Sequence, residues 1–267
     1  MKQVPLRADQ PIVQSLQEKR FANVPVSDIE MQSFLRQAKA ISSNSLEGVF
    51  ATAYVYGFWR KFSQAEDHAD KLVAGWPSTP QAFYYATVCY GISCCYEKGL
   101  KAAQRLCELE PGRPRGANML SYISLLSGAI SEYARARQIM KRIGVPEAEI
   151  PSIENMRESD FLTQNGIDQS DVVRYYQLHL NVAKPFLEGK QNMHLGSDVH
   201  LCTDPEDGSQ EFWINLVTST DGITASKIDW EFSKQDFDGF SDNFKEKVWV
   251  GISLAPDDGV EPRRIQV

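Results

Sequence analysis

Four of the five cysteines of this chain fall within residues 88–107, VCYGISCCYEKGLKAAQRLC. Such a cluster first suggests a zinc site or a redox site, because thiolates bind zinc and are the reactive groups of redox pairs. The spacings of five, one and twelve residues contain no Cys-x-x-Cys pair, and on one helix the first two would point about 140° apart. We therefore predict that these cysteines pack between helices as small apolar side chains. They are Cys89, Cys94, Cys95 and Cys107.

A second set of residues near the carboxyl end could bind a metal ion, as imidazole, carboxylate and thiolate are plausible zinc ligands. All its members have even numbers, so on a strand they would share the face opposite the apolar residues. Side chains two residues apart on a strand are roughly 6.5–7 Å apart, so another element would have to help. The other interpretation, which we favour, is the solvated polar face of a half-buried hairpin. The set is His194, Asp198, His200 and Cys202.

The composition excludes several classes of protein. The 267 residues are 42% hydrophobic and 10% aromatic, which is typical of a folded chain with one or two domains. Neither a signal peptide nor an apolar run of roughly 18–20 residues occurs, so we expect no membrane partner. An odd number of cysteines without secretory context predicts reduced thiols and a cytoplasmic protein. Neither a glycine-rich phosphate loop nor a Gly-x-Ser-x-Gly motif is found, and we predict no enzyme and no cofactor.

Charge is distributed unevenly along the chain. Residues 1–156 carry 18 Lys+Arg and 15 Asp+Glu, a net of +3, whereas residues 157–267 carry 10 and 20, a net of −10. The acidic half disfavours nucleic acid as a partner, because phosphate binding needs cationic surface. It leaves open an immunity or inhibitor protein whose acidic domain masks a basic target.

Repetition organises the first half of the chain. Pro77 and Pro111 are 34 residues apart, and Pro146 follows 35 residues later. Small residues precede each proline by 12 positions, and aromatic residues recur at the same period. A period near 34 with these markers is typical of stacked helix–turn–helix units. The small residues are Ala65, Gly99 and Ala134, and the aromatic pairs are Phe62 with Tyr96 and Tyr56 with Tyr90.

The repeats resemble the tetratricopeptide repeat family over about residues 46–146. KGLKAAQRLCELEP looks like that family's second helix and closing proline, and KFSQAEDHADKLVAGWP and GAISEYARARQIMKRIGVP share parts of the pattern. The chain departs from the family at its first-helix glycine position, where Ala53, Thr87 and Ser121 stand. An ordinary six-helix bundle is the alternative.

The resemblance implies a concave groove lined by the first helix of each unit. Tetratricopeptide proteins that bind acidic carboxylates place Lys and Asn there, whereas this chain has Phe50 and Tyr54, so we expect an apolar peptide or helix as partner. In this respect the chain is similar to bacterial secretion chaperones built from three such repeats. The groove could instead be filled by the chain's own residues 1–45 or by its second domain. The predicted groove residues are Phe50, Tyr54, Phe58, Tyr84, Val88, Ile92, Asn118, Tyr122 and Leu126.

The second half predicts a small α+β domain with a mainly antiparallel sheet. A helix over 168–187 is followed by alternating segments near 193–202, 212–216, 228–232 and 248–254, with a short helix near Phe237, Phe240 and Phe244. We thus expect an α and α+β chain: an irregular lead-in (1–27), an all-α repeat solenoid (28–146), a linker (147–167), an acidic α+β domain (168–255) and a tail (256–267). The predicted function is a non-catalytic, cytoplasmic, bacterial adaptor or chaperone-like protein that binds a protein or peptide. A metal-dependent enzyme or metalloprotein using the strand-face set is the alternative.

Overall fold

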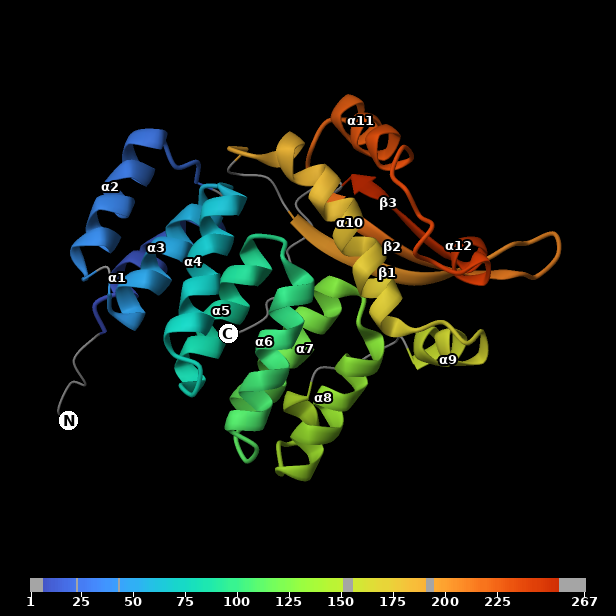
Figure 1. The fold of residues 1–267 in the computed structure, drawn as a ribbon, viewed down its shortest axis with the longest axis horizontal. Helices are drawn as coiled ribbons and strands as arrows, with labels where there is room; N and C mark the ends of the chain where they lie inside the picture. Colours follow the sequence, from blue (N-terminus) through green and yellow to red (C-terminus); the bar gives the residue numbers. More distant parts are fainter. Residues whose placement is uncertain (1–6, 23, 43, 151–155, 191–194, 255–267) are drawn as a thin grey trace. The chain divides into compact units, whose positions relative to one another are not determined.

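The computed structural model describes residues 7–22, 24–42, 44–150, 156–190 and 195–254. The chain divides into two compact units, which are shown in Figure 1. The amino-terminal unit holds residues 1–110 with 187–192, and the carboxy-terminal unit holds residues 111–186 with 193–267. The division falls inside the stretch of repeats, between the second and the third. Among the described residues, no helix combines the length and the apolar character needed to cross a membrane.

The amino-terminal unit is a run of consecutive helices, each packed against its neighbours. Helix starts recur at steps of 34 residues: α3 and α5 begin at 46 and 80, and α2, α4 and α6 begin at 28, 62 and 96. The helical-repeat arrangement expected from the prolines is therefore confirmed, and its period extends back to α2. The helices are α1 (Gln10–Phe21), α2 (Asp28–Ala40), α3 (Leu46–Phe58), α4 (Phe62–Gly75), α5 (Pro80–Ile92) and α6 (Tyr96–Leu109).

Local sequence explains where these helices begin. The Ser27 side chain accepts from the amide of Glu30 while the Glu30 carboxylate accepts from the amide of Ser27, so the predicted capping box is present. Ser45 caps α3 through the amide of Gly48 at 3.1 Å. Pro80 stands in the first turn of α5, where its missing N–H costs nothing.

The carboxy-terminal unit begins with a further hairpin at the same period, since α7 starts at 114 and α8 at 130. The stretch 147–167, predicted as a linker, contains a helix whose Phe161 and Leu162 are buried. Pro185 lies inside the last long helix, which continues two residues beyond it. The helical elements are α7 (Pro114–Ser127), α8 (Ile130–Arg142), η1 (Glu147–Glu149), α9 (Met156–Gln164), α10 (Gln169–Leu187), α11 (Gly222–Phe232) and α12 (Asp242–Lys247).

The sheet of this unit has three strands in the order β1-β2-β3: β1 (Leu195–Thr203), β2 (Gln210–Thr218) and β3 (Val248–Leu254). The β1–β2 hairpin is antiparallel as predicted, but β2 and β3 pair in parallel, so the sheet is mixed. The prediction of a mainly antiparallel sheet is corrected accordingly. Parallel neighbours need a crossover connection, and α11 and α12 provide it.

The predicted third strand at 228–232 was wrong, because this segment is helix α11. The Asp221 side chain caps it by accepting from the amide of Thr224 at 2.9 Å. The buried residues Ala225, Ile228 and Phe232 follow a helical spacing, whereas Trp230 is 65% exposed. Alternation of Ile228, Trp230 and Phe232 was therefore coincidental.

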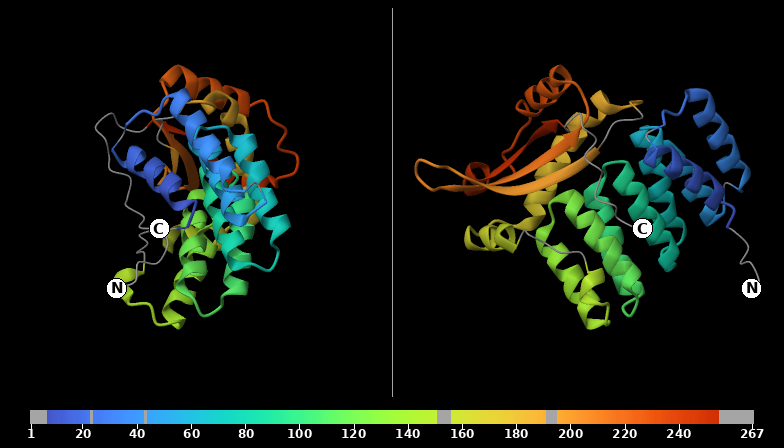
Figure 2. Two further views of the ribbon diagram at one scale, coloured as in Figure 1. Left: turned by 90° about the vertical axis from the view of Figure 1, so that its left-hand side faces the viewer. Right: turned by 180° about the vertical axis from the view of Figure 1, so that it is seen from behind.

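The two faces of the sheet differ. One face is covered by α10, which crosses in front of the strands in Figure 1, and Tyr176 of α10 lies 2.8 Å from Ser197 of β1. The view from behind in Figure 2 shows the strands in front of α10. We call the second side the open face. Its residues are Gly196, Asp198, His200 and Cys202 of β1, Glu211, Trp213, Asn215 and Val217 of β2, and Trp249, Gly251 and Ser253 of β3.

Candidate functional site

Six of the predicted groove residues belong to the amino-terminal unit, three on α3 and three on α5. Phe58, Tyr84, Val88 and Ile92 are partly buried. Phe50 and Tyr54 are only 4% and 5% exposed, so in this form of the chain they offer almost no free surface. The remaining three, Asn118, Tyr122 and Leu126, lie on α7 in the carboxy-terminal unit; Asn118 is exposed and the other two are partly buried.

An aromatic stack holds α3 and α5 together at this face. The rings of Phe50 and Tyr85 are parallel within 3°, with centroids 3.7 Å apart. Tyr84 leans on Tyr85 at 6.0 Å. Tyr85 is 1% exposed, and the 34-residue register did not predict its role, because that register leads from Phe50 to Tyr84. The adjacent Tyr-Tyr pair was the available signal, since one ring of such a pair must turn toward the neighbouring helix.

The chain's own amino-terminal segment contacts this stack. The Tyr85 hydroxyl donates to the Asp9 carboxylate at 3.3 Å, and the Arg7 guanidinium lies 5.4 Å from the centroid of the Tyr85 ring. Asp9 immediately precedes α1, which packs on α3 and buries Ile12 and Leu16. In the amino-terminal unit, part of residues 1–45 therefore lies against this stack: Arg7 and Asp9 contact Tyr85 of α5, and α1 packs on α3.

Asp9 is a buried carboxylate with incomplete hydrogen bonding. It is 1% exposed, its Oδ1 finds no hydrogen-bond donor, and the nearest cationic atom, Arg7 Nε, is 3.8 Å away. Burial raises the pKa of Asp9 above its ordinary value, although Arg7 and hydrogen bonds oppose the shift. Folding therefore favours the protonated form, and the stability that this gives is present below about pH 3.8 and is lost as the pH rises through the higher folded value.

Asp9→Asn is expected to stabilise the protein at pH 7 by about 1 kcal/mol, because it removes a buried charge with an unsatisfied oxygen. The gain should shrink as the pH falls and vanish near pH 3, where Asp9 is protonated. Urea unfolding at pH 3, 5 and 7 measures this. Glu18→Gln, at an exposed position of α1, is the control and should show no comparable pH trend. A constant difference across the three pH values would contradict the assignment to Asp9.

Cys94 and Cys95 lie at the connection between α5 and α6, whereas Cys89 is on α5 and Cys107 is near the end of α6. Cys89, Cys94 and Cys95 are buried and Cys107 is partly buried, and none of the chain's five cysteines, all within the described residues, forms a disulfide. Burial raises the pKa of the Cys89 thiol, which keeps it protonated and unreactive. The packing role predicted for these residues agrees with this geometry.

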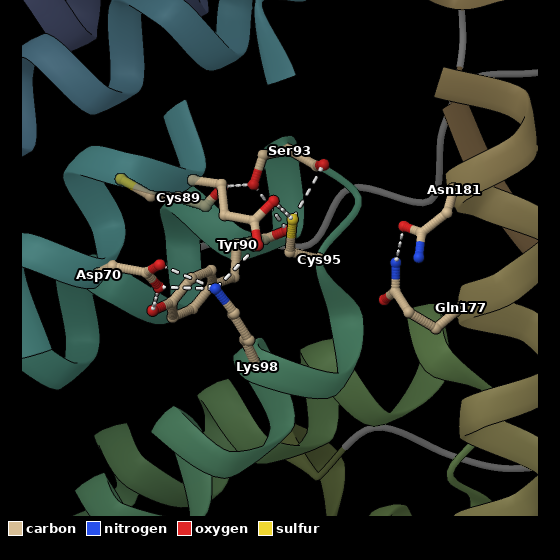
Figure 3. A network of polar contacts seen from close by, with 9 residues as sticks. Asp70, Cys89, Tyr90, Ser93, Cys95, Lys98, Gln177 and Asn181 are labelled. Atoms are coloured by element: carbon tan, nitrogen blue, oxygen red, sulfur yellow. Dashed lines mark hydrogen bonds and ion pairs between the residues drawn. The ribbon is translucent and has the colours of Figure 1, made fainter. Parts of the chain in front are cut away.

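A polar network joins α4, α5 and α6 beside the cysteines (Figure 3). Lys98 Nζ lies 2.8 Å from both Glu66 and Asp70, and the Tyr90 hydroxyl donates to Asp70 at 2.6 Å. The Cys95 thiol donates to Glu66 at 3.0 Å. Burial opposes the charge of Lys98, but its two carboxylate partners raise its pKa. Each group has a structural partner, so we assign the network to holding adjacent repeats in register.

The second predicted set lies on β1. Asp198, His200 and Cys202 share the open face, as their even numbers predicted, and His200 Nδ1 lies 3.3 Å from Asp198 Oδ2. His194 lies outside the described residues. Within the described ranges, no three His, Cys, Asp or Glu side chains converge on a point where a metal ion could bind. Burial and the charge of Glu211 raise the pKa of Cys202, which disfavours the thiolate that a metal would need.

The open face also carries two tryptophans, Trp213 and Trp249, which the sequence-based prediction of a metal site did not include. The register pairs His200 with Trp213 and Trp213 with Trp249, one residue from each strand. The two indoles stack with ring centroids 5.9 Å apart and planes within 17°. Trp249 is 43% exposed, which is unusual for so large an apolar side chain. The alternation of β2 and β3 could have indicated this pair had their pairing been known.

This chain was compared with protein-family models and with curated proteins. No protein-family model matches it, and no curated protein matches it. Function must therefore be argued from the two surfaces described above.

Proposed function

We propose that this chain is a non-catalytic protein-interaction protein of the tetratricopeptide type, whose α3–α5 face binds an apolar helical segment of a protein partner. One observation carries the proposal: the chain's own α1 packs on α3, and Arg7 and Asp9 just before it contact Tyr85 of α5. The cytoplasm is the proposed location, since none of the five cysteines forms a disulfide.

The contacts of α1 indicate what kind of segment the face accepts. Ile12 and Leu16, four residues apart on one side of α1, are 4% and 0% exposed. At the amino-terminal end of the helix, Asp9 accepts from Tyr85 and Arg7 lies over the same ring. A partner helix with two aliphatic residues at this spacing and a carboxylate one turn earlier would reproduce these contacts. Such a partner has to displace α1.

A peptide of residues 7–22 (RADQPIVQSLQEKRFA) with a fluorescent label tests this proposal by anisotropy. We expect weak binding to the wild-type chain, because α1 in cis competes at a high effective concentration. Leu16→Glu should expel α1, since a buried unpaired carboxylate is costly, and should tighten peptide binding at least tenfold. Gln14→Glu adds the same charge at an exposed position of α1 and should leave binding near the wild-type value.

Two further measurements make the result decisive. A peptide carrying the Leu16→Glu change should not bind any of the three proteins. Circular dichroism of the Leu16→Glu chain should show that helix is lost only to the extent of α1. Equal binding by the Leu16→Glu and Gln14→Glu chains would refute the proposal that this face is a displaceable helix site.

A further inference from the structure

The open face of the sheet presents a second surface, which the proposed function does not use. Its centre is the stacked pair Trp213 and Trp249, and both rings are at least partly accessible. The indole N–H of Trp213 donates to Glu211 Oε2 at 3.1 Å. This hydrogen bond places a carboxylate beside the aromatic pair and restrains the orientation of the Trp213 ring. An aromatic platform with a carboxylate at its side is therefore built into the sheet.

The neighbouring row of the sheet gives this platform a flat border. Asp198, Asn215 and Gly251 are paired across the three strands, one register step along from the tryptophans. A Cβ added at Gly251 would come within 3.2 Å of the Asn215 side-chain oxygen, so glycine leaves room for that amide to lie across β3. Asn215 is only 8% exposed, so the middle of this row offers little surface of its own beside the tryptophans.

Carboxylates predominate around the platform. Glu211 adjoins Trp213, Asp198 lies in the next row with its side chain 60% exposed, and the β1–β2 turn adds three more acids. Hydrogen bonds from Ser209, and after them the charge of Lys247, lower the pKa of the Asp207 carboxyl below its ordinary value. His200 Nδ1 lies 3.3 Å from Asp198 Oδ2. Residues 157–267 together carry a net charge of −10. The acids of the turn are Asp204, Glu206 and Asp207.

We infer that the open face binds a basic protein segment by stacking an arginine guanidinium on the exposed Trp249 ring of the Trp213–Trp249 pair, near the Glu211 carboxylate. Arginine fits better than lysine, because its planar group stacks on a ring and also donates two parallel hydrogen bonds to a carboxylate. The same unit already uses the motif internally. The Arg174 guanidinium lies 4.3 Å from the Phe240 ring centroid, and Lys234 Nζ lies 5.2 Å from that of Trp230.

The charge of the face distinguishes this ligand from the others that aromatic platforms bind. Single-stranded nucleic acid also stacks on exposed rings of a sheet, but its phosphates would meet Glu211, Asp198 and the acidic turn. Neutral sugars stack on tryptophan as well, and they gain nothing from the surrounding carboxylates. Cationic partners gain from both the rings and the charge, so charge complementarity favours a basic segment.

The probe for this site is a blocked peptide, acetyl-GRGRGRG-amide, with a matched peptide in which citrulline replaces each arginine. Citrulline keeps the planar shape and removes the charge. Binding to the full chain is followed by the indole N–H resonances of the five tryptophans in two-dimensional NMR. We expect the arginine peptide to shift the signals of Trp213 and Trp249 selectively, and its affinity to fall with added NaCl because the contact is partly ionic.

Three variants assign the site. Trp249→Ala should weaken binding at least tenfold, and Glu211→Gln, which keeps the indole acceptor but removes the charge, should weaken it severalfold. Trp230→Ala removes another tryptophan of the same unit, which is 65% exposed, and should leave the affinity unchanged. Thermal melting confirms that each variant is folded; should Trp249→Ala not fold, Glu211→Gln decides alone.

Several results would overturn the inference. These are no selective shift of the Trp213 and Trp249 signals at millimolar peptide, equal binding of the citrulline peptide, or preferred binding of cellohexaose or of an oligothymidylate. An equal loss of affinity in Trp230→Ala would also overturn it. None of these results tests the α3–α5 face, and the α1 peptide experiment does not test the open face. The two proposals can therefore be refuted independently.

Discussion

Gly48→Ala is expected to lower the free energy of unfolding by about 3 kcal/mol or more, because the added methyl group would meet backbone atoms. Gly48 is buried in the first turn of α3, and its amide donates to the capping Ser45. A Cβ there would lie 2.2 Å from the carbonyl oxygen of Ser42 and 2.5 Å from that of Ile41. Both are backbone atoms, which cannot rotate away as a side chain could. The α2–α3 connection must therefore shift.

Gly75→Ala is the matched control for this prediction. Gly75 is also helical, at the end of α4, but no atom lies within 4 Å of the position that its Cβ would take. Its replacement should be neutral or stabilising by up to about 1 kcal/mol, because alanine has the higher helix propensity. Urea unfolding monitored by circular dichroism compares the two. Similar stabilities for the two variants would show that the close approach at Gly48 is relaxed in solution.

Tyr175→Ala should have the second largest effect, a loss of about 3 kcal/mol in the carboxy-terminal unit. The Tyr175 ring on α10 lies edge-on to four phenylalanines, with centroid distances of 5.1 to 5.4 Å. Such pairs contribute beyond the area they bury, and here one ring serves all four. The phenylalanines are Phe232 at the end of α11, Phe237 and Phe240 in the segment that follows, and Phe244 on α12.

Tyr175→Phe keeps the ring and should cost less than about 1 kcal/mol. Hydrogen exchange at the amides of β2 and β3 locates the effect, because loss of this cluster loosens the connection that brings β3 to the sheet. Near-equal exchange rates in Tyr175→Ala and Tyr175→Phe would contradict the central role given to the ring.

Local signals in the sequence predicted much of the helical part. The Ser27–Glu30 capping box and the prolines at 34-residue spacing are properties of a few neighbouring residues, and both were found as expected. Ile228, Trp230 and Phe232 misled because three residues can satisfy a period of 2 and still lie on a capped helix. The parallel pairing of β2 with β3 depends on contacts distant in sequence, which no local pattern reports.

The candidate sites show the same difference between features set by neighbouring residues and features set by contacts distant in sequence. Asp198, His200 and Cys202 were correctly placed on one face by strand alternation alone. The contact of the amino-terminal segment with the Phe50–Tyr85 stack could not be read from the repeat register, since Asp9 and Tyr85 are 76 positions apart. Likewise, the Trp213–Trp249 stack exists only because two strands from different parts of the chain are neighbours.

The mixed pairing of the sheet has a consequence for how this unit is made. The β1–β2 hairpin joins strands separated only by residues 204–209, so it can close early and locally. β3 can pair in parallel with β2 only after residues 219–247 have formed the crossover connection. That connection contains α11 and α12, whose aromatic side chains pack on α10. Because contacts of high sequence separation slow folding, docking of β3 should be the late step. During synthesis the sheet would then remain incomplete until nearly all of these 267 residues had left the ribosome.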